Sequence, residues 1–178
     1  KSPIYCDNRQ TLSYPEIRTA IRNAFVHKIK SEYPGLTAIA GVATGGIALG
    51  ALVADALELP MIYIRSKAKG HGLGNMVEGK IDPQGKYVVI EDLVSTGGSS
   101  AKAVKALQET GAEVLVTLSI FSYGFPQADV TFAETGTPYA PLATLADLLT
   151  KAHEIGYLTE SQSAAIQEWR VNPSQWRQ

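Results

Sequence analysis

The sequence predicts an α/β fold in which a mainly parallel sheet is flanked by helices. Strand-like and helix-like segments alternate along the chain, and glycine-rich turns at residues 41–48 and 95–99 each join an apolar run to a helical pattern. Such alternation places helices on both faces of the sheet. A chain of 178 residues can bury roughly 70% of its unfolded surface. We therefore expect a single domain over residues 1–178.

The elements follow in order from periodicity. Residues 14–32 carry apolar side chains at helical spacing, with Pro15 suited to a first turn. A second helix is expected at residues 46–57, a third from Ser99, and a last helical segment around residues 164–169. Apolar and β-branched runs predict strands at residues 37–42, 61–65, 87–91 and 113–122.

The alternation stops between residues 66 and 85. This segment has little periodic apolar pattern and contains five glycines, namely Gly70, Gly72, Gly74, Gly79 and Gly85. A long flexible loop or a hairpin hood is expected here.

Residues 33–54 carry no charge and are long enough to cross a bilayer as one helix. Gly41, Gly45 and Gly46 interrupt this stretch, which favours a strand, a tight turn and a helix over a membrane span. The net charge of −1 favours neither nucleic acid nor an anionic membrane as a partner. The lone cysteine, Cys6, cannot form an internal disulfide and fits a reducing cytoplasm. The chain does not begin with Met, so we expect that its natural start is missing.

The segment YVVIEDLVSTGGSS at residues 87–100 has the composition of a sugar-phosphate site. Glu91 and Asp92 are expected at the carboxyl end of a buried strand, where α/β sheets bind ligands, and two carboxylates there can hold ribose hydroxyls. The turn from Ser95 to Ser99 can direct N–H and O–H groups at a phosphate. In the alternative, Ser95 or Thr96 is only an N-cap and the carboxylates are solvated.

The turn GVATGGIA at residues 41–48 has the glycine spacing of a P-loop, but Ile47 stands where the lysine would be. The remaining interpretation is a backbone nest that accepts an anion. An alternative is that the glycines only allow a helix to pack closely on a strand.

Residues 87–100 resemble the motif with which type I phosphoribosyltransferases bind 5-phosphoribosyl 1-diphosphate (PRPP). The segments SPIYCDNR (residues 2–9) and IRSKAKGHG (residues 64–72) resemble the orotate phosphoribosyltransferase family, the second its mobile catalytic loop. The resemblance covers nearly the whole chain. It implies a type I phosphoribosyltransferase-like fold and Mg²⁺-dependent transfer of the 5-phosphoribosyl group from PRPP to orotate, giving orotidine 5′-monophosphate in pyrimidine (UMP) biosynthesis. It also implies a further N-terminal segment.

The resemblance implies the roles of individual residues. Lys69, His71 and Asp92 are expected to be catalytic, because displacement at the anomeric carbon develops charge that fixed groups can stabilise. Tyr5 and Ser95 are expected to contact orotate, although Tyr5 could be an ordinary core tyrosine. PRPP is expected to contact Thr44, Gly45, Arg65, Lys67, Lys69, His71, Glu91, Asp92, Leu93, Val94, Ser95, Thr96, Gly97, Gly98 and Ser99. No metal-binding residues are expected, since PRPP itself would hold most of the Mg²⁺.

The chain departs from the family pattern at three points. Gly45 stands near the place of a family lysine, Ser66 replaces a basic residue with Lys67 one place later, and the sequence FSYGF at residues 121–125 lacks an arginine that some members use for orotate. The resemblance also implies a homodimer in which the loop of residues 65–85 closes over the PRPP site of the neighbouring subunit. A purine phosphoribosyltransferase and a non-catalytic PRPP-sensing regulator are the alternatives, and Lys69 and His71 favour an enzyme.

Overall fold

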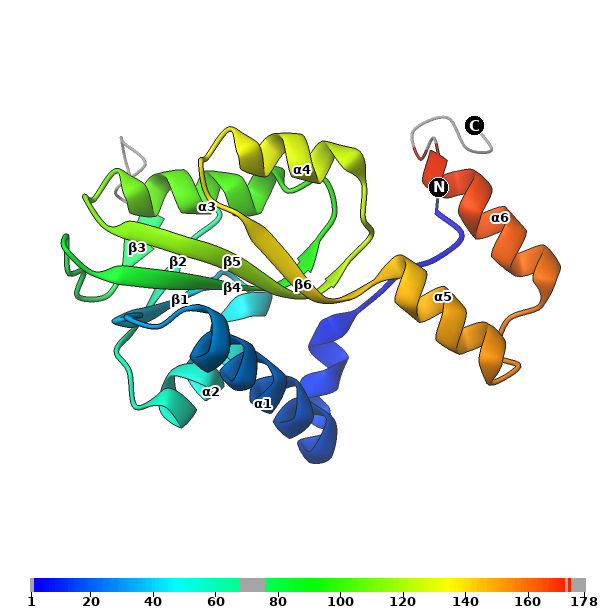
Figure 1. Ribbon diagram of the computed structural model, residues 1–178, viewed down its shortest axis with the longest axis horizontal. Helices are drawn as coiled ribbons and strands as arrows, with labels where there is room; N and C mark the ends of the chain where they lie inside the picture. The colour runs from blue at the N-terminus through cyan, green and yellow to red at the C-terminus, as the bar shows by residue number, and fades with distance from the viewer. Residues whose placement is uncertain (1, 68–75, 172, 174–178) are drawn as a thin grey trace.

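The computed structural model describes residues 2–67, 76–171 and 173. Within them the chain forms a six-stranded sheet of order β3-β2-β1-β4-β5-β6, in which β2 and β3 are antiparallel and all other neighbours are parallel. Helices lie on both faces, as expected (Figure 1). The strands are β1 (Ala38–Val42), β2 (Met61–Ile64), β3 (Val77–Glu78), β4 (Lys86–Val94), β5 (Glu113–Ser122) and β6 (Tyr139–Thr144). The helices are η1 (Asn8–Ser13), α1 (Pro15–Glu32), α2 (Gly45–Leu57), α3 (Gly98–Gln108), α4 (Pro126–Ala133), α5 (Leu145–Glu154) and α6 (Glu160–Val171).

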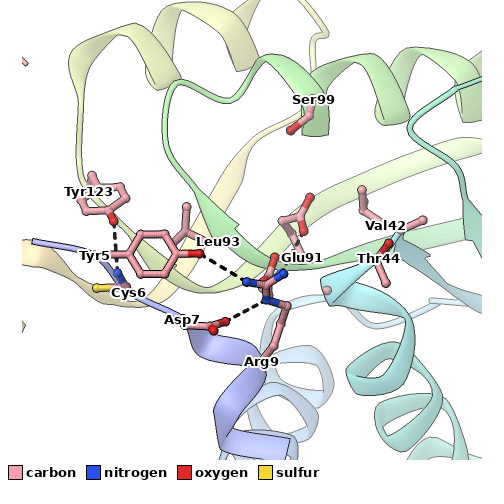
Figure 2. Close-up of a pocket in the computed structure, with 13 residues that line it drawn as sticks. Tyr5, Cys6, Asp7, Arg9, Val42, Thr44, Glu91, Leu93, Ser99 and Tyr123 are labelled. Carbon is pink, nitrogen blue, oxygen red and sulfur yellow. Dashed lines mark hydrogen bonds and ion pairs between the residues drawn. The ribbon is translucent and has the colours of Figure 1, made fainter. Parts of the chain in front are cut away.

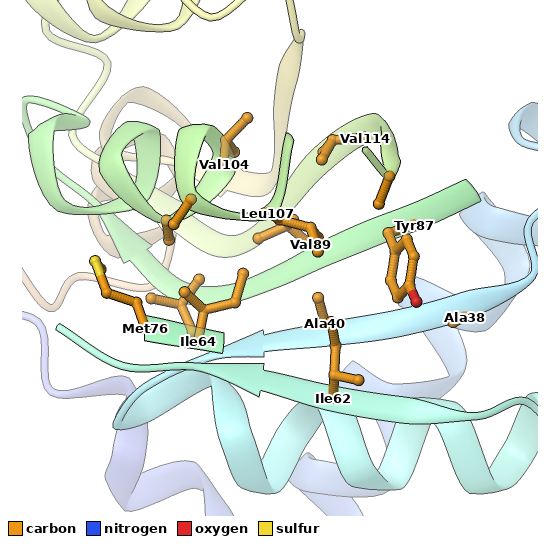
Figure 3. Packing of buried hydrophobic residues seen from close by; sticks show 14 of the residues in the cluster. Ala38, Ala40, Ile62, Ile64, Met76, Tyr87, Val89, Val104, Leu107 and Val114 are labelled. Atoms are coloured by element: carbon orange, nitrogen blue, oxygen red, sulfur yellow. The ribbon is translucent and has the colours of Figure 1, made fainter. Parts of the chain in front are cut away.

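The sheet is buried on both faces, which explains the continuous apolar runs of its central strands. Along β4, Val89 points toward α3 and α4, where it packs with Ile62 and Leu107 (Figure 3). Val88 and Ile90 of the same strand point to the opposite face and pack against α1 and α2. The uncharged residues 33–54 therefore contribute β1 and most of α2 to this layered α/β fold. No helix of the described residues is long and apolar enough to cross a bilayer.

The expected element boundaries hold with one correction that matters for the site. β5 has the predicted limits, but β4 runs to Val94, three residues beyond the expected end at Glu91. The reason is the length of β5, which continues the ladder by pairing Phe121 with Leu93 and Ser122 with Val94. Glu91 and Asp92 are therefore held in the sheet itself.

Two strands were not predicted. β6 contains Pro141 and lies at the edge of the sheet, the position in which a strand tolerates proline, and proline weakens any strand signal. β3 lies within the segment expected to be a loop or hairpin, where Val77 pairs with Ile64 of β2. Residues 68–75 of that segment are outside the described residues.

Helices α5 and α6 lie beyond β6, away from the two helical layers, and the N-terminal segment runs beside them (Figure 1). An aromatic cluster joins them to the end of β5. The ring of Tyr123 is stacked on Phe125 at 5.6 Å and meets Trp169 of α6 edge-on at 5.6 Å. Ile4 and Cys6 pack against this cluster, which holds the N-terminal segment close to the carboxyl ends of the strands.

Candidate active site

A cavity of about 490 Å³ opens at the carboxyl ends of β1 and β4 (Figure 2). These strands are neighbours, but α2 leads from β1 to β2 on one side and α3 leads from β4 to β5 on the other. The cavity thus lies at the switch point where open α/β sheets bind ligands. Its lining consists of Tyr5, Cys6, Asp7, Arg9, Val42, Ala43, Thr44, Gly45, Glu91, Asp92, Leu93, Ser99 and Tyr123.

Two helices begin at this cavity without a side-chain cap. The N-cap residues are Thr44 for α2 and Gly97 for α3, and neither makes a side-chain capping bond. By contrast, Thr144 caps α5 with a complete capping box. The first N–H groups of α2 and α3 remain available, and each helix adds its partial positive charge at this end. The cavity therefore has two separate positions suited to a phosphate group.

The alternative in which Ser95 or Thr96 caps α3 is wrong, because the N-cap is Gly97 in a left-handed conformation with φ 81°. Of the turn, Ser99 lines the cavity. Ser95 is half-buried and Thr96 is exposed, and neither is among the described lining residues. Gly98 is exposed, and a Cβ added there would meet no other heavy atom within 4 Å.

The glycines of the first turn allow close packing. A Cβ added at Gly46 would lie 2.2 Å from the carbonyl oxygen of Ile90, so α2 approaches β4 as closely as only glycine allows. A Cβ at Gly45 would lie 2.3 Å from Cγ of Asp92. A lysine at position 45 would thus collide with Asp92 as it is placed here.

The two carboxylates have different surroundings. Glu91 is 6% exposed, and its oxygens accept hydrogen bonds from the Asp92 N–H at 3.0 Å and from Ser100 Oγ at 3.0 Å. Burial, together with the Asp92 carboxylate, raises the pKa of Glu91 to about 8, so Glu91 is mostly protonated near neutral pH. The alternative of a solvated Glu91 is wrong. Asp92 is half-buried and lines the cavity, and its main-chain oxygen accepts a bond from Asn8 Nδ2 at 2.8 Å.

The N-terminal segment forms a wall of the cavity that the sequence analysis did not foresee beyond Tyr5. The Cys6 N–H donates to the hydroxyl of Tyr123 at 3.4 Å. Arg9 donates from Nε to Asp7 at 2.8 Å and from Nη2 to the Tyr5 hydroxyl at 3.3 Å (Figure 2). The bond from Arg9 lowers the pKa of Asp7. Tyr5 is 75% exposed, so the alternative of a core tyrosine is wrong.

The signal for this wall was present in the segment SPIYCDNR, where Asp7 and Arg9 stand two residues apart at the start of η1. Tyr123 carried no such signal, because it stands just past the strand expected at residues 113–122. Only the tertiary fold brings the end of β5 to the N-terminal segment.

Val94, Arg65 and Lys67 are not among the residues that line this cavity. Val94 is fully buried, and its carbonyl oxygen accepts a bond from the Tyr123 N–H, so its side chain is not available to a ligand. Arg65 follows β2 and forms an ion pair with Glu78 at 3.5 Å. Lys67 is exposed. Lys69 and His71 lie outside the described residues.

The comparisons with known proteins agree with this geometry. The model of the phosphoribosyl transferase domain matches residues 10–124. The orotate phosphoribosyltransferase of Cytophaga hutchinsonii is 50% identical over 99% of this chain and 84% of its own length. The crystal structure of orotate phosphoribosyltransferase from Aeropyrum pernix is 29% identical with a TM-score of 0.75, over 87% of this chain and 85% of that one.

A further solved structure, Leishmania donovani UMP synthase, is 25% identical with a TM-score of 0.82. It matches 96% of this chain, which spans only 36% of that longer chain. The sheet, the cavity at its switch point and the matched domain define a phosphoribosyltransferase of type I. Within that class, the chain belongs to the orotate phosphoribosyltransferase family.

Proposed function

We propose that this protein transfers the 5-phosphoribosyl group of PRPP to a ring nitrogen of orotate, giving orotidine 5′-monophosphate and diphosphate. The observation that carries the proposal is the pair of uncapped helix N-termini at one cavity that also holds Asp92. PRPP has a phosphate group at each end and a ribose between them, and this arrangement offers a partner for each part.

In this proposal the diphosphate lies at Thr44 and Gly45, where α2 begins, and the 5′-phosphate lies at the start of α3 beside Ser99. Asp92 accepts hydrogen bonds from the ribose hydroxyls. Glu91 differs from the role expected from the sequence, because its carboxyl oxygens already accept bonds from Asp92 N–H and Ser100. Glu91 instead positions the strand end and Asp92.

The reaction breaks the bond between the anomeric carbon and the diphosphate oxygen and forms a bond from that carbon to nitrogen. Positive charge develops on the ribose ring and negative charge on the departing diphosphate. The Asp92 carboxylate stabilises the ring charge, and the N–H groups of α2 stabilise the diphosphate. Lys69 and His71 are proposed, from the family resemblance, to neutralise the leaving group further.

Mg²⁺ is proposed as the cofactor, held mainly by PRPP. Within the described part of the chain no cluster of three or more histidine, cysteine or acidic side chains could hold a metal ion. In this proposal the ion takes most of its oxygen ligands from substrate and water, with Asp92 as the nearby protein carboxylate. When bound, Mg²⁺ would supply positive charge against the diphosphate.

We also propose a homodimer in which residues 65–85 serve the PRPP site of the neighbouring subunit, and a role in pyrimidine (UMP) biosynthesis in the cytoplasm. The family resemblance supports the dimer and the pathway. The single cysteine, Cys6, is consistent with a reducing compartment.

The function is tested by supplying PRPP and Mg²⁺ with orotate, uracil, adenine or hypoxanthine in turn and measuring diphosphate release. We expect release with orotate alone. Equal turnover with a purine would reject the orotate assignment in favour of the purine enzyme. Binding of PRPP without diphosphate release from any base would favour the regulator.

A further inference from the structure

Arg9 is the only cation among the described residues that line the cavity. The other acidic side chains there belong to Asp7, Asp92 and Glu91, the last of which is mostly protonated near neutral pH. An anionic base that enters this cavity therefore meets the carboxylates of Asp7 and Asp92, and Arg9 is the described lining side chain that can offset them. No arginine follows β5, where residues 123–125 are Tyr, Gly and Phe.

Two hydrogen bonds orient the guanidinium of Arg9, and they leave some of its N–H donors free. Nε donates to Asp7 at 2.8 Å and Nη2 donates to the Tyr5 hydroxyl at 3.3 Å. An arginine has five N–H donors, so both N–H groups of Nη1 and one of Nη2 have no partner in the described part of the chain. Two neighbouring nitrogens can therefore bind both oxygens of a carboxylate. The side chain is 56% exposed, so a ligand can reach it.

The position of Arg9 suits the base better than either phosphate. Arg9 lies in the N-terminal wall beside the ring of Tyr5, whereas Thr44 lies at the far side of the cavity and Ser99 above it (Figure 2). A planar heterocycle that stacks on the exposed Tyr5 ring would place a ring substituent near the guanidinium.

We propose that Arg9 is a specificity-determining residue that binds the carboxylate of the base, with Asp7 holding the guanidinium in place. This inference rests on the proposed function, because it names the group that recognises the acidic substituent of orotate. It explains how the cavity selects an acidic pyrimidine over uracil, which lacks the carboxylate.

The test compares two nucleotides that differ only in this carboxylate, orotidine 5′-monophosphate and uridine 5′-monophosphate. Their dissociation constants are measured by calorimetry for the wild type, Arg9→Gln and Arg9→Lys. Arg22→Gln is the matched control, since Arg22 bonds to Asn23 on α1 and does not line the cavity. Thermal unfolding checks that each variant is folded.

We expect Arg9→Gln to bind orotidine 5′-monophosphate about 10- to 100-fold more weakly, the effect of losing a hydrogen-bonded charge pair, with uridine 5′-monophosphate unchanged. Arg9→Lys keeps the charge but cannot make the bidentate contact, so an intermediate loss of affinity for orotidine 5′-monophosphate is expected. In kinetics, the KM for orotate should rise while the KM for PRPP stays the same.

An equal loss for both nucleotides, or no loss for either, would overturn the inference. If Arg9→Gln does not fold, an unchanged preference for orotidine 5′-monophosphate in Arg9→Lys would overturn it equally. The proposed function is judged separately, by orotate-dependent diphosphate release from the wild type. That activity can stand while the role of Arg9 fails.

Discussion

The buried carboxyl group of Glu91 should make the stability of the unliganded protein depend on pH. Its pKa is raised by burial from an ordinary value of 4.5 to about 8. Between these values the folded protein holds a proton that the unfolded chain releases, so the free energy of unfolding falls as pH rises. The slope approaches about 1.4 kcal/mol per pH unit for one proton, and the whole window corresponds to at most roughly 5 kcal/mol.

The variant Glu91→Gln removes this titration with little change of shape. The amide oxygen can accept the Asp92 N–H, and the amide nitrogen can donate to Ser100 Oγ, so both observed contacts keep a partner. Urea unfolding between pH 5 and pH 8 should show a falling free energy for the wild type and a flatter curve for the variant. Glu109→Gln, at an exposed position after α3, is the control and should follow the wild type. Parallel curves for wild type and Glu91→Gln would refute the proton on Glu91.

The remaining predictions concern Asp92 and two glycines. Asp92→Asn should lower turnover roughly 10²- to 10³-fold without unfolding the protein, as measured by diphosphate release, and normal turnover would remove Asp92 from the site. The Asp92→Asn variant can also be mixed with a variant altered at both Lys69 and His71. If sites are shared between subunits, about a quarter of wild-type activity should return, because about half of the dimers are hybrids with one intact site. Confirmed subunit exchange without recovery would reject shared sites. Gly46→Ala should destabilise the protein by about 1–3 kcal/mol or more in urea unfolding, because the new Cβ meets a main-chain oxygen. Gly98→Ala meets nothing within 4 Å and should be close to neutral; equal losses would refute the packing argument.

The sequence predicted the architecture well because its signals were local. β5 and the two glycine turns are marked by apolar runs and by breakers, and the structure places them as expected. β6 was missed because Pro141 obscures an edge strand whose pairing comes from β5. The extension of β4 to Val94 was missed for a similar reason, since pairing with a longer neighbour determines it.

The site was predicted less completely, because its properties arise from tertiary contacts. The motif at residues 87–100 led us to expect Asp92 and Ser99 at the site, and both line the cavity. From the same motif we expected Glu91 and Asp92 alike to hold ribose hydroxyls. Glu91 is buried and accepts a hydrogen bond from Ser100 of α3, a tertiary arrangement that no spacing reveals. Arg9 reaches the cavity only because the N-terminal segment packs on the aromatic cluster around Tyr123.

The charge balance of the cavity indicates what else catalysis requires. The described lining has three acidic side chains and one arginine, although PRPP and orotate are both anions. A proton on Glu91 removes one negative charge, and the starts of α2 and α3 add only partial positive charges. The described lining thus offers less positive charge than the two anions carry negative charge, so we expect groups beyond this lining to contribute. Mg²⁺ bound to PRPP and the basic residues proposed for the loop, Lys69 and His71, supply this positive charge in the proposed mechanism. Positive charge at that place would stabilise the diphosphate as it departs, where it would lower the barrier most.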